Sequence, residues 1–285
     1  MTVPRPLCLA AGRLAGLAWG EAGGPTWLAL HGWLDNAASF SRLAPRLVEA
    51  LGIRVVALDF AGHGQSRHRA GDYALWDYCH DVLDALDDLG LERAPLLAHS
   101  MGAGVACLLA AALPERIVSL TLIDGMGALT TEAAAAPGQL RKGLRAHRRS
   151  PSTAPRYPDE KSAVASRVAG GATPIDGETA RPLVRRNLVV EPDGHLRLRS
   201  DPRLLRPSPV RFTPDQVRAM LEAIRCPVLL LEAESGILAG RPGAASARRA
   251  IAGLQRRVLA GGHHLHLEPA AVGAVAEAIV AGHLD

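Results

Sequence analysis

The 285-residue chain contains few cysteines, and their arrangement excludes two common kinds of site. Cys8, Cys79, Cys107 and Cys226 are far apart in the sequence, with no C-x-x-C pair and no metal-ligand spacing. This pattern argues against a disulfide framework or a zinc site and favours a reducing compartment. We therefore expect neither a metal nor a cofactor.

Long apolar runs are also missing. The N-terminal stretch MTVPRPLCLAAGRLAGLAWG is apolar, but Arg13 and repeated Gly and Pro interrupt it before a signal-peptide core or a membrane-spanning length accumulates. The sequence thus predicts a soluble, cytoplasmic protein without a membrane partner. A chain of this length buries about three quarters of its unfolded surface, so folding requires no partner, and both a monomer and a homodimer stay open.

Positive charge is concentrated in one part of the chain, although the net charge is only +4. Between Pro137 and Arg225 there are 18 Lys and Arg against 9 Asp and Glu. Attraction of an anionic substrate is one interpretation of this excess. A solvated arginine-rich face is the favoured one, because the arginines lack the aromatic interleaving or the compact run of a nucleic-acid site. We expect no nucleic-acid partner.

The segment from Ala94 to Ala112, APLLAHSMGAGVACLLAAA, predicts a strand, a sharp turn and a helix, with Ser100 at the turn. Ala98 and Gly102 lie two residues before and after the serine and are small, as a steep strand-to-helix turn requires. The usual pattern is G-x-S-x-G, and here Ala98 replaces the first glycine. Ser100 would lie over the helix N-terminus, where unpaired N–H groups favour an oxyanion. A buried serine in an ordinary loop is the alternative.

Strands and helices alternate through the first part of the chain. Strands are predicted at 7–11, 14–19, 27–30, 54–58, 95–98 and 117–123, and helices from an N-cap at Ser39, over 76–89 and after the turn at Ser100. This alternation is typical of an open parallel sheet, whose ligand sites lie beyond the carboxyl ends of the strands. Trp33, Ser100 and Asp124 all fall at such ends.

The alternation stops after Leu129 and resumes with a strand predicted at 228–231. The Pro- and Arg-rich sequence between them has weak helical signals at 139–149, 160–168 and 177–187. Because so long a segment is rarely structureless in a compact protein, we predict an inserted lid over 128–225 and a core domain formed by 1–127 and 226–285. A helix over 241–254, a last strand at 257–259 and a terminal helix from Pro269 complete the prediction.

A serine hydroxyl becomes a nucleophile only when a base lies within hydrogen-bond reach and a carboxylate orients that base. His263 is the preferred base, because it follows Gly261 and Gly262 after the last predicted strand, in a loop that can place an imidazole over the sheet. His264 and His266 are its competitors. His266 is better suited to packing or capping at the final helix.

Taken together, these motifs resemble the α/β-hydrolase superfamily along essentially the full length. The matching segments are LHGW at 30–33, DFAGHGQS at 59–66, AHSMG at 98–102 and GGHHLHLE at 261–268, in the family's order and at its spacing. HGWLDNAASF, LIDGMG at 122–127 and DPRLL…PSP in the insertion resemble the serine hydrolase-like branch. The resemblance implies an α/β fold with a mostly parallel, doubly wound sheet of eight strands and an inserted helical lid.

The resemblance also implies roles for individual residues. Ser100 would be the nucleophile, His263 the general base, and the backbone N–H groups of Trp33 and Met101 the oxyanion hole, which holds charge that develops only in the transition state. Two further histidines lie next to these residues. We expect His31 to orient the oxyanion loop, and His99 to pack or to line the pocket.

The acid is where the sequence departs from the commoner pattern of the family. Most members carry it after the strand predicted at 228–231, in a segment ending G-x-x-D, but this chain reads LLLEAESG there. Asp124, after the strand that follows the turn helix, is a position that some branches use. We prefer Asp124 over Glu234, with Glu232 third. A simple turn residue before Gly125 is the alternative reading of Asp124.

These assignments predict a serine hydrolase, and more narrowly a carboxylesterase, that cleaves a small carboxylic ester or related acyl compound through an acyl-enzyme on Ser100. Its partner would be a small-molecule substrate. Serine at the turn argues against the dehalogenase and epoxide hydrolase chemistries of the same fold, which use Asp there. A catalytically weak binding or sensing protein is the alternative, kept open by the missing Asp, and a carbon–carbon bond hydrolase on the same triad is another.

Overall fold

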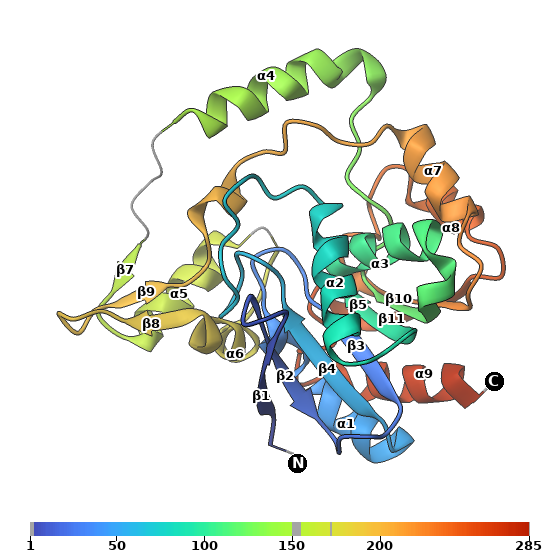
Figure 1. Cartoon of the computed structure of the whole chain (residues 1–285), viewed down its shortest axis with the longest axis horizontal. Coiled ribbons are helices and arrows are strands. Elements are labelled where there is room, and N and C mark those ends of the chain that lie inside the picture. The colour runs from blue at the N-terminus through green and yellow to red at the C-terminus, as the bar shows by residue number, and fades with distance from the viewer. Residues whose placement is uncertain (1–2, 150–154, 172, 285) are drawn as a thin grey trace.

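The computed structural model describes residues 3–149, 155–171 and 173–284. Its central element is an eight-stranded sheet in which β1 and β2 form an antiparallel hairpin, β2 pairs antiparallel with β4, and all other neighbours are parallel. Most of these strands are labelled in Figure 1. Their order in the sheet is β1 (Arg5–Leu9), β2 (Leu14–Trp19), β4 (Arg54–Asp59), β3 (Thr26–Leu30), β5 (Ala94–His99), β6 (Ile117–Ile123), β10 (Val228–Ser235) and β11 (Gln255–Gly262). The mostly parallel eight-stranded sheet is confirmed.

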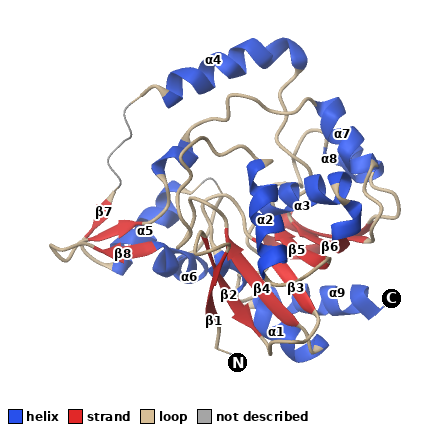
Figure 2. Ribbon diagram, viewed as in Figure 1, coloured by secondary structure: helices blue, strands red, loops and turns tan. Residues whose placement is uncertain are grey.

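Helices cover both faces of this sheet (Figure 2). One face packs on α1 (Leu43–Leu51) and α9 (Val272–Leu284), and the other on α2 (Asp77–Asp88), α3 (Met101–Ala112), α7 (Pro214–Glu222) and α8 (Ala244–Ala250), with the 3-10 helix η2 (Pro114–Arg116) after α3. Each face has its own buried cluster, built around Phe60, Leu86 and Val105 on the α3 side and around Phe40 and Val275 on the α1 side. Burial on both faces explains why the central strands are continuous apolar runs in the sequence.

The chain between β3 and β4 differs from the prediction. A 3-10 helix, η1 (Ala37–Phe40), comes first, and its N-cap is the side chain of Asn36, which accepts a hydrogen bond from the Ala38 N–H. Ser39 therefore lies inside this short helix and caps nothing. Its hydroxyl lies 2.7 Å from Nε2 of His266, so it serves a tertiary contact instead.

The segment 128–225 contains helices where the sequence indicates them, together with a small sheet that the sequence does not indicate. Its elements are η3 (Ala133–Ala135), α4 (Ala136–His147), β7 (Arg156–Tyr157), α5 (Glu160–Gly170), α6 (Gly177–Asn187), β8 (Leu188–Val190), β9 (Leu196–Leu198), η4 (Pro202–Leu205) and α7. The three strands pair antiparallel in the order β7-β9-β8. On α7, Val217 and Leu221 join the cluster under α3, so this helix packs with the core. The boundaries at 128 and 225 stay a prediction.

The segment 128–225, named the lid below after the prediction, is held at the carboxyl edge of the sheet by buried polar contacts. Arg186 of α6 binds the fully buried carboxylate of Asp59, with Nε 3.0 Å from Oδ1 and Nη2 2.8 Å from Oδ2. Asn36 donates from Nδ2 to the carbonyl of Leu183 at 2.8 Å. These contacts place α6 against the loops that follow β3 and β4.

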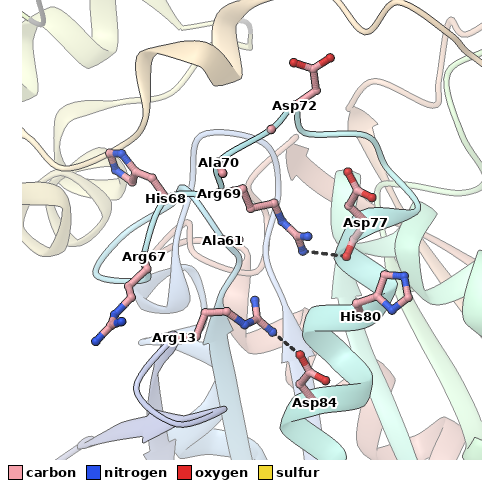
Figure 3. Close-up of a pocket in the computed structure, with 11 residues that line it drawn as sticks. Arg13, Ala61, Arg67, His68, Arg69, Ala70, Asp72, Asp77, His80 and Asp84 are labelled. Carbon is pink, nitrogen blue, oxygen red and sulfur yellow. Dashed lines mark hydrogen bonds and ion pairs between the residues drawn. The ribbon is translucent and has the colours of Figure 1, made fainter.

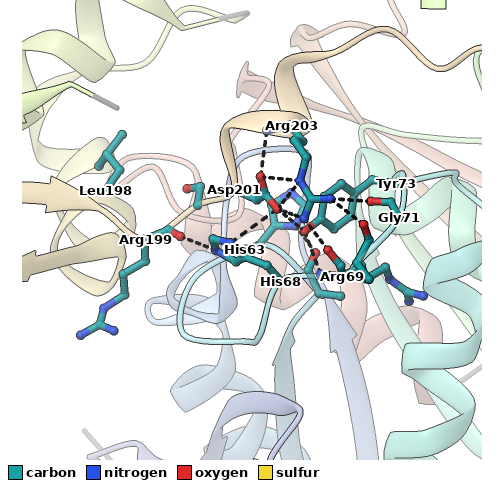
Figure 4. A network of polar contacts seen from close by, with 12 residues as sticks. His63, His68, Arg69, Gly71, Tyr73, Leu198, Arg199, Asp201 and Arg203 are labelled. Carbon is teal, nitrogen blue, oxygen red and sulfur yellow. Dashed lines mark hydrogen bonds and ion pairs between the residues drawn. The ribbon is translucent and has the colours of Figure 1, made fainter. Parts of the chain in front are cut away.

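A second network ties the end of the lid to the loop before α2 (Figure 4). The Tyr73 hydroxyl donates to Oδ2 of Asp201 at 2.7 Å, and Arg203 binds the same carboxylate as well as the carbonyls of Ala70 and Gly71. Burial opposes ionisation of Asp201, but the hydrogen bonds from Arg203 and Tyr73 outweigh it and lower the pKa of that carboxyl group.

Among the described residues, none of the helices has both the length and the apolar character needed to cross a membrane.

Candidate active site

Ser100 occupies the sharp turn between β5 and α3. Its φ of 52° and ψ of −112° lie in a backbone region that residues other than glycine rarely adopt, so the turn holds the serine under strain. Close packing on both sides maintains this turn. A Cβ on Gly102 would lie 2.4 Å from the Leu30 carbonyl oxygen, and one on Gly125 would lie 2.6 Å from Cα of Ser100. Small residues are therefore required where strand, turn and neighbouring loops meet.

Three predicted side chains meet in one hydrogen-bonded chain. Nε2 of His263 lies 2.9 Å from Oγ of Ser100, and Nδ1 of His263 lies 2.6 Å from Oδ2 of Asp124. A carboxylate only accepts hydrogen bonds, so Nδ1 carries the ring proton and Nε2 is left with a lone pair facing the serine hydroxyl. This is the tautomer that a general base for Ser100 needs. His263 and Asp124 are buried, while Ser100 is partly exposed.

The structure shows how Asp124 fits where the sequence lacks the commoner acid. The end of β10 and the loop after it turn their backbone towards the Asp124 carboxylate: the Ala233 N–H of β10 donates to Oδ1 at 3.4 Å, and the Ile237 N–H of the loop donates to Oδ2 at 2.8 Å. A Cβ on Gly236 would lie 2.3 Å from both carboxylate oxygens. The loop therefore supplies hydrogen bonds and room for an acid that comes from β6.

Neither alternative acid is hydrogen-bonded to His263. Glu232 is buried, but its carboxylate is bound by Arg248 at 2.5 and 2.8 Å and by Arg256 at 2.8 Å. Burial opposes ionisation of Glu232, and the hydrogen bonds from the two arginines outweigh it and lower its pKa. The side chain of Glu234 is exposed to solvent. Of the three candidates, the structure brings Asp124 alone to the histidine.

One of the two residues predicted to form the oxyanion hole directly follows the serine, and the other lies in the loop after β3, where the His31 carbonyl accepts the Gly102 N–H at 3.1 Å. Met101 is the first residue of α3, where the backbone N–H has no acceptor within the helix. Trp33 lies in the loop after β3, and its indole Nε1 donates to the Leu204 carbonyl of the lid at 3.1 Å. Trp33 is 40% exposed, and this hydrogen bond ties its indole to η4. Their role as oxyanion donors stays a prediction.

His31 and His99 are both fully buried, so they support the site's loops and do not line a pocket. Nε2 of His31 accepts the Phe60 N–H at 3.0 Å, which leaves Nδ1–H to donate to the Gly32 carbonyl at 2.7 Å. Burial lowers the pKa of His31 to about 4, so the ring is neutral and holds the loop at Gly32 through these two bonds. His99 donates from Nε2 to the carbonyl of His263 at 2.9 Å.

Sequence reasoning missed a buried carboxylate beside the histidines. Asp35, in the loop after Trp33, lies with Oδ2 3.1 Å from Nε2 of His264 and with Oδ1 3.5 Å from Nη2 of Arg167. His264 is therefore bound to Asp35, and His266 to Ser39, which leaves His263 alone facing the serine. No periodic pattern marks these contacts, because each joins segments far apart in the chain.

A pocket of about 610 Å³ lies away from these residues, between the β1–β2 turn, the loop before α2 and α2 itself (Figure 3). Its walls include Arg13, Arg69 and Asp84, whose charges are paired within the wall: Arg13 binds Asp81 and Asp84, and Arg69 binds Asp81. None of the predicted site residues lines it. Across the described ranges, no cluster of three or more His, Cys, Asp or Glu is arranged to hold a metal ion.

The fold and the hydrogen-bonded serine, histidine and aspartate define a hydrolase of the α/β class. The family model for the alpha/beta hydrolase fold matches residues 25–270, and the chain belongs to this family. Within it, the chain falls in the serine hydrolase-like branch: it is 32% identical over 275 residues to a serine hydrolase-like protein of Dictyostelium discoideum, covering 90% of this chain and 74% of the relative.

Solved structures agree with this assignment. A hypothetical protein from Pseudomonas aeruginosa PAO1 has a TM-score of 0.89 and 43% sequence identity, with 99% of each chain covered. The thioesterase domain from the curacin biosynthetic pathway has a TM-score of 0.84 and 26% identity, again over 99% of each chain.

Proposed function

We propose that the protein cleaves a small carboxylic ester or related acyl compound, such as a thioester, through an acyl-enzyme on Ser100. The observation that carries this proposal is the hydrogen-bonded chain from Ser100 Oγ through His263 to Asp124, with the proton on Nδ1. The thioesterase activity named for one similar structure supports an acyl substrate. The branch to which the chain belongs supports hydrolysis by serine.

In the first half of the reaction, Nε2 of His263 takes the proton of Ser100 while Oγ attacks the acyl carbon. The carbonyl oxygen becomes an oxyanion, which the backbone N–H groups of Trp33 and Met101 stabilise. Asp124 stabilises the imidazolium that forms. The imidazolium then gives its proton to the leaving alcohol or thiol, and the acyl group stays on Ser100.

In the second half, a water molecule replaces the leaving group. Nε2 of His263 takes a proton from this water as its oxygen attacks the acyl carbon. The tetrahedral intermediate collapses, Ser100 regains its proton from the imidazolium, and the carboxylic acid leaves. The net reaction consumes one water and returns the enzyme to its starting protonation state.

Fluorophosphonate labelling tests the first step. We expect intact mass spectrometry to show one adduct on the wild-type protein at Ser100 and none on Ser100→Ala, with labelling slowed strongly in His263→Ala. Folded wild-type protein, checked by circular dichroism, that stays unlabelled would contradict the proposal.

Turnover is tested with p-nitrophenyl esters from acetate to octanoate and with short acyl thioesters. The wild type should hydrolyse at least one of them with a burst of the leaving group, because the acyl-enzyme accumulates when its hydrolysis is slower. Equal rates for wild type and Ser100→Ala would rule out Ser100 chemistry. Labelling without turnover of any acyl substrate would favour the carbon–carbon bond hydrolase, which uses the same triad.

The binding or sensing alternative rests on the acid missing after β10, and the hydrogen bond between Asp124 and His263 supports the catalytic proposal over it. The small-molecule substrate, the monomeric or homodimeric state and the cytoplasmic location stay predictions.

A further inference from the structure

Four buried histidines form one cluster around the catalytic loop. The ring of His99 packs against those of His263, His264 and His266, with centroid distances of 4.6, 5.2 and 4.2 Å. All four side chains are buried. The charged groups that face this cluster are Asp35 and, through it, Arg167 of the lid, in addition to Asp124 at His263 itself.

Two hydrogen bonds hold the chain on either side of the His263 ring. His99 donates from Nε2 to the backbone carbonyl of His263 at 2.9 Å. The next residue, His264, donates from Nε2 to Oδ2 of Asp35 at 3.1 Å, because a carboxylate only accepts. The backbone that carries the base is thus fixed by one histidine and by the side chain of Asp35.

Asp35 links this loop to the lid. Its backbone N–H donates to the Gly32 carbonyl at 3.1 Å, and its carboxylate lies 3.5 Å from Nη2 of Arg167 on α5. Burial opposes ionisation of Asp35, but His264 and Arg167 outweigh it and hold the pKa of Asp35 below its ordinary value. One buried anion therefore contacts the oxyanion loop, the catalytic loop and the lid.

We propose that Asp35 is a positioning residue for His263, and that Arg167 keeps it in place by balancing its charge, so that the seated lid aligns the catalytic base. The proposal rests on the function proposed above and adds a role for two residues outside the triad. Neither residue touches the reacting atoms. Their effect passes through His264, through His99 and through the oxyanion loop.

The charges explain why Arg167 is needed. Since His99 donates from Nε2, the neutral ring has a lone pair on Nδ1, and this atom faces Oδ2 of Asp35 at 3.7 Å. The lone pair of His99 and the carboxylate of Asp35 repel each other at this distance, and the positive charge of Arg167 offsets that repulsion. Without Arg167, Asp35 would favour a proton on His99, and the rings would rearrange. His31, which also faces Asp35, is held neutral by its bond to the Phe60 N–H.

Imidazole NMR tests the charge balance without any need for turnover. In protein labelled with ¹⁵N in its histidine rings, we expect wild-type His99 to be neutral at pH 7, with its proton on Nε2. Arg167→Gln should move the His99 ring towards the protonated form, because a positive charge is lost. Arg181→Gln is the matched control, since Arg181 is an exposed lid arginine paired with Glu160.

Unchanged His99, His264 and His263 signals in Arg167→Gln would overturn the proposal. So would the same changes in Arg181→Gln. Arg167→Lys restores the charge and should return the wild-type spectrum, whereas a merely structural role for the guanidinium would leave the lysine variant as altered as the glutamine variant.

The rate of fluorophosphonate labelling at Ser100 tests the consequence for the base. We expect Asp35→Asn and Arg167→Gln to lower it about 10- to 100-fold, as expected for a catalytic group moved by a fraction of an ångström, and to change its pH profile. Arg181→Gln should label like the wild type, and Arg167→Lys should recover most of the rate. If the wild type itself is not labelled, the proposed function fails, while the histidine spectra still decide the positioning role.

Discussion

Replacing Arg186 with Met should destabilise the protein far more than the same change one residue earlier. Arg186 is 8% exposed and forms a two-point ion pair with Asp59, whose side chain is fully buried. Removing one partner of a buried pair leaves the other charge uncompensated and costs about 3 to 5 kcal/mol of unfolding free energy. The Ala37 and Gln65 N–H groups still donate to Asp59, at 2.7 and 2.8 Å, which favours the lower end of that range.

Arg185→Met is the control, because Arg185 is 69% exposed and its pair with Glu160 lies at the surface. Such a pair contributes less than about 1 kcal/mol. Urea unfolding, followed by tryptophan fluorescence and circular dichroism, measures both free energies. A double-mutant cycle with Asp59→Asn should give a coupling of about 1 to 3 kcal/mol, because the neutral amide no longer needs the guanidinium. Additive effects, or equal losses in the two arginine variants, would refute the reasoning.

Three further predictions concern the triad and its supports. Asp124→Asn should lower kcat by about 10⁴-fold by favouring the wrong imidazole tautomer, while Glu234→Gln should not change it; the reverse pattern in an ester assay would assign the acid to Glu234. Gly236→Ala should slow fluorophosphonate labelling, because its Cβ would lie 2.3 Å from the Asp124 carboxylate oxygens. Gly240→Ala has open space around it and should label normally. Equal labelling rates in the two variants would count against a role for the loop after β10 in holding Asp124. Burial lowers the pKa of His63 from 6.5 to about 3. Between pH 6.5 and pH 3 the imidazole therefore takes up a proton in the unfolded chain only, and the stability of the folded protein falls as the pH falls. At pH 5 this costs about 2 kcal/mol, so His63→Asn should lose correspondingly less stability between pH 7 and pH 5, and an equal loss in a urea series would contradict it.

The sequence predicts the sheet well because its strands are buried on both faces and its turns carry local signals. The strands β2 and β6 match the predicted ranges. The turn at Ser100 can be predicted from the small residues Ala98 and Gly102 on either side of it. Three helices of the segment 128–225 also lie where the sequence indicates them, with α6 at the predicted 177–187, whereas α7 is not predicted. Local pattern and packing agree in these places, and such consistency makes a segment predictable.

What the sequence does not predict depends on contacts between distant segments. The strands of the lid sheet have two or three residues, too few to show a period of two. Ser39 has the composition of an N-cap, but Asn36 takes that position and Ser39 bonds to His266. The pairs of Asp35 with Arg167 and of Asp59 with Arg186 join the core to the lid, and no spacing rule connects their members.

The position of Asp124 has a consequence for how the site assembles. Ser100 and Asp124, the proposed nucleophile and acid, directly follow the neighbouring strands β5 and β6, and the Ser100 N–H donates to the Ile123 carbonyl at 3.1 Å. The base alone arrives with β11, the outermost strand, which is added at the edge beyond β10. A chain ending before β11 would carry a serine and an aspartate in register without a base. Supplying residues from β11 onward as a separate peptide would then make labelling of Ser100 a reporter for docking of the C-terminal edge, independent of any substrate.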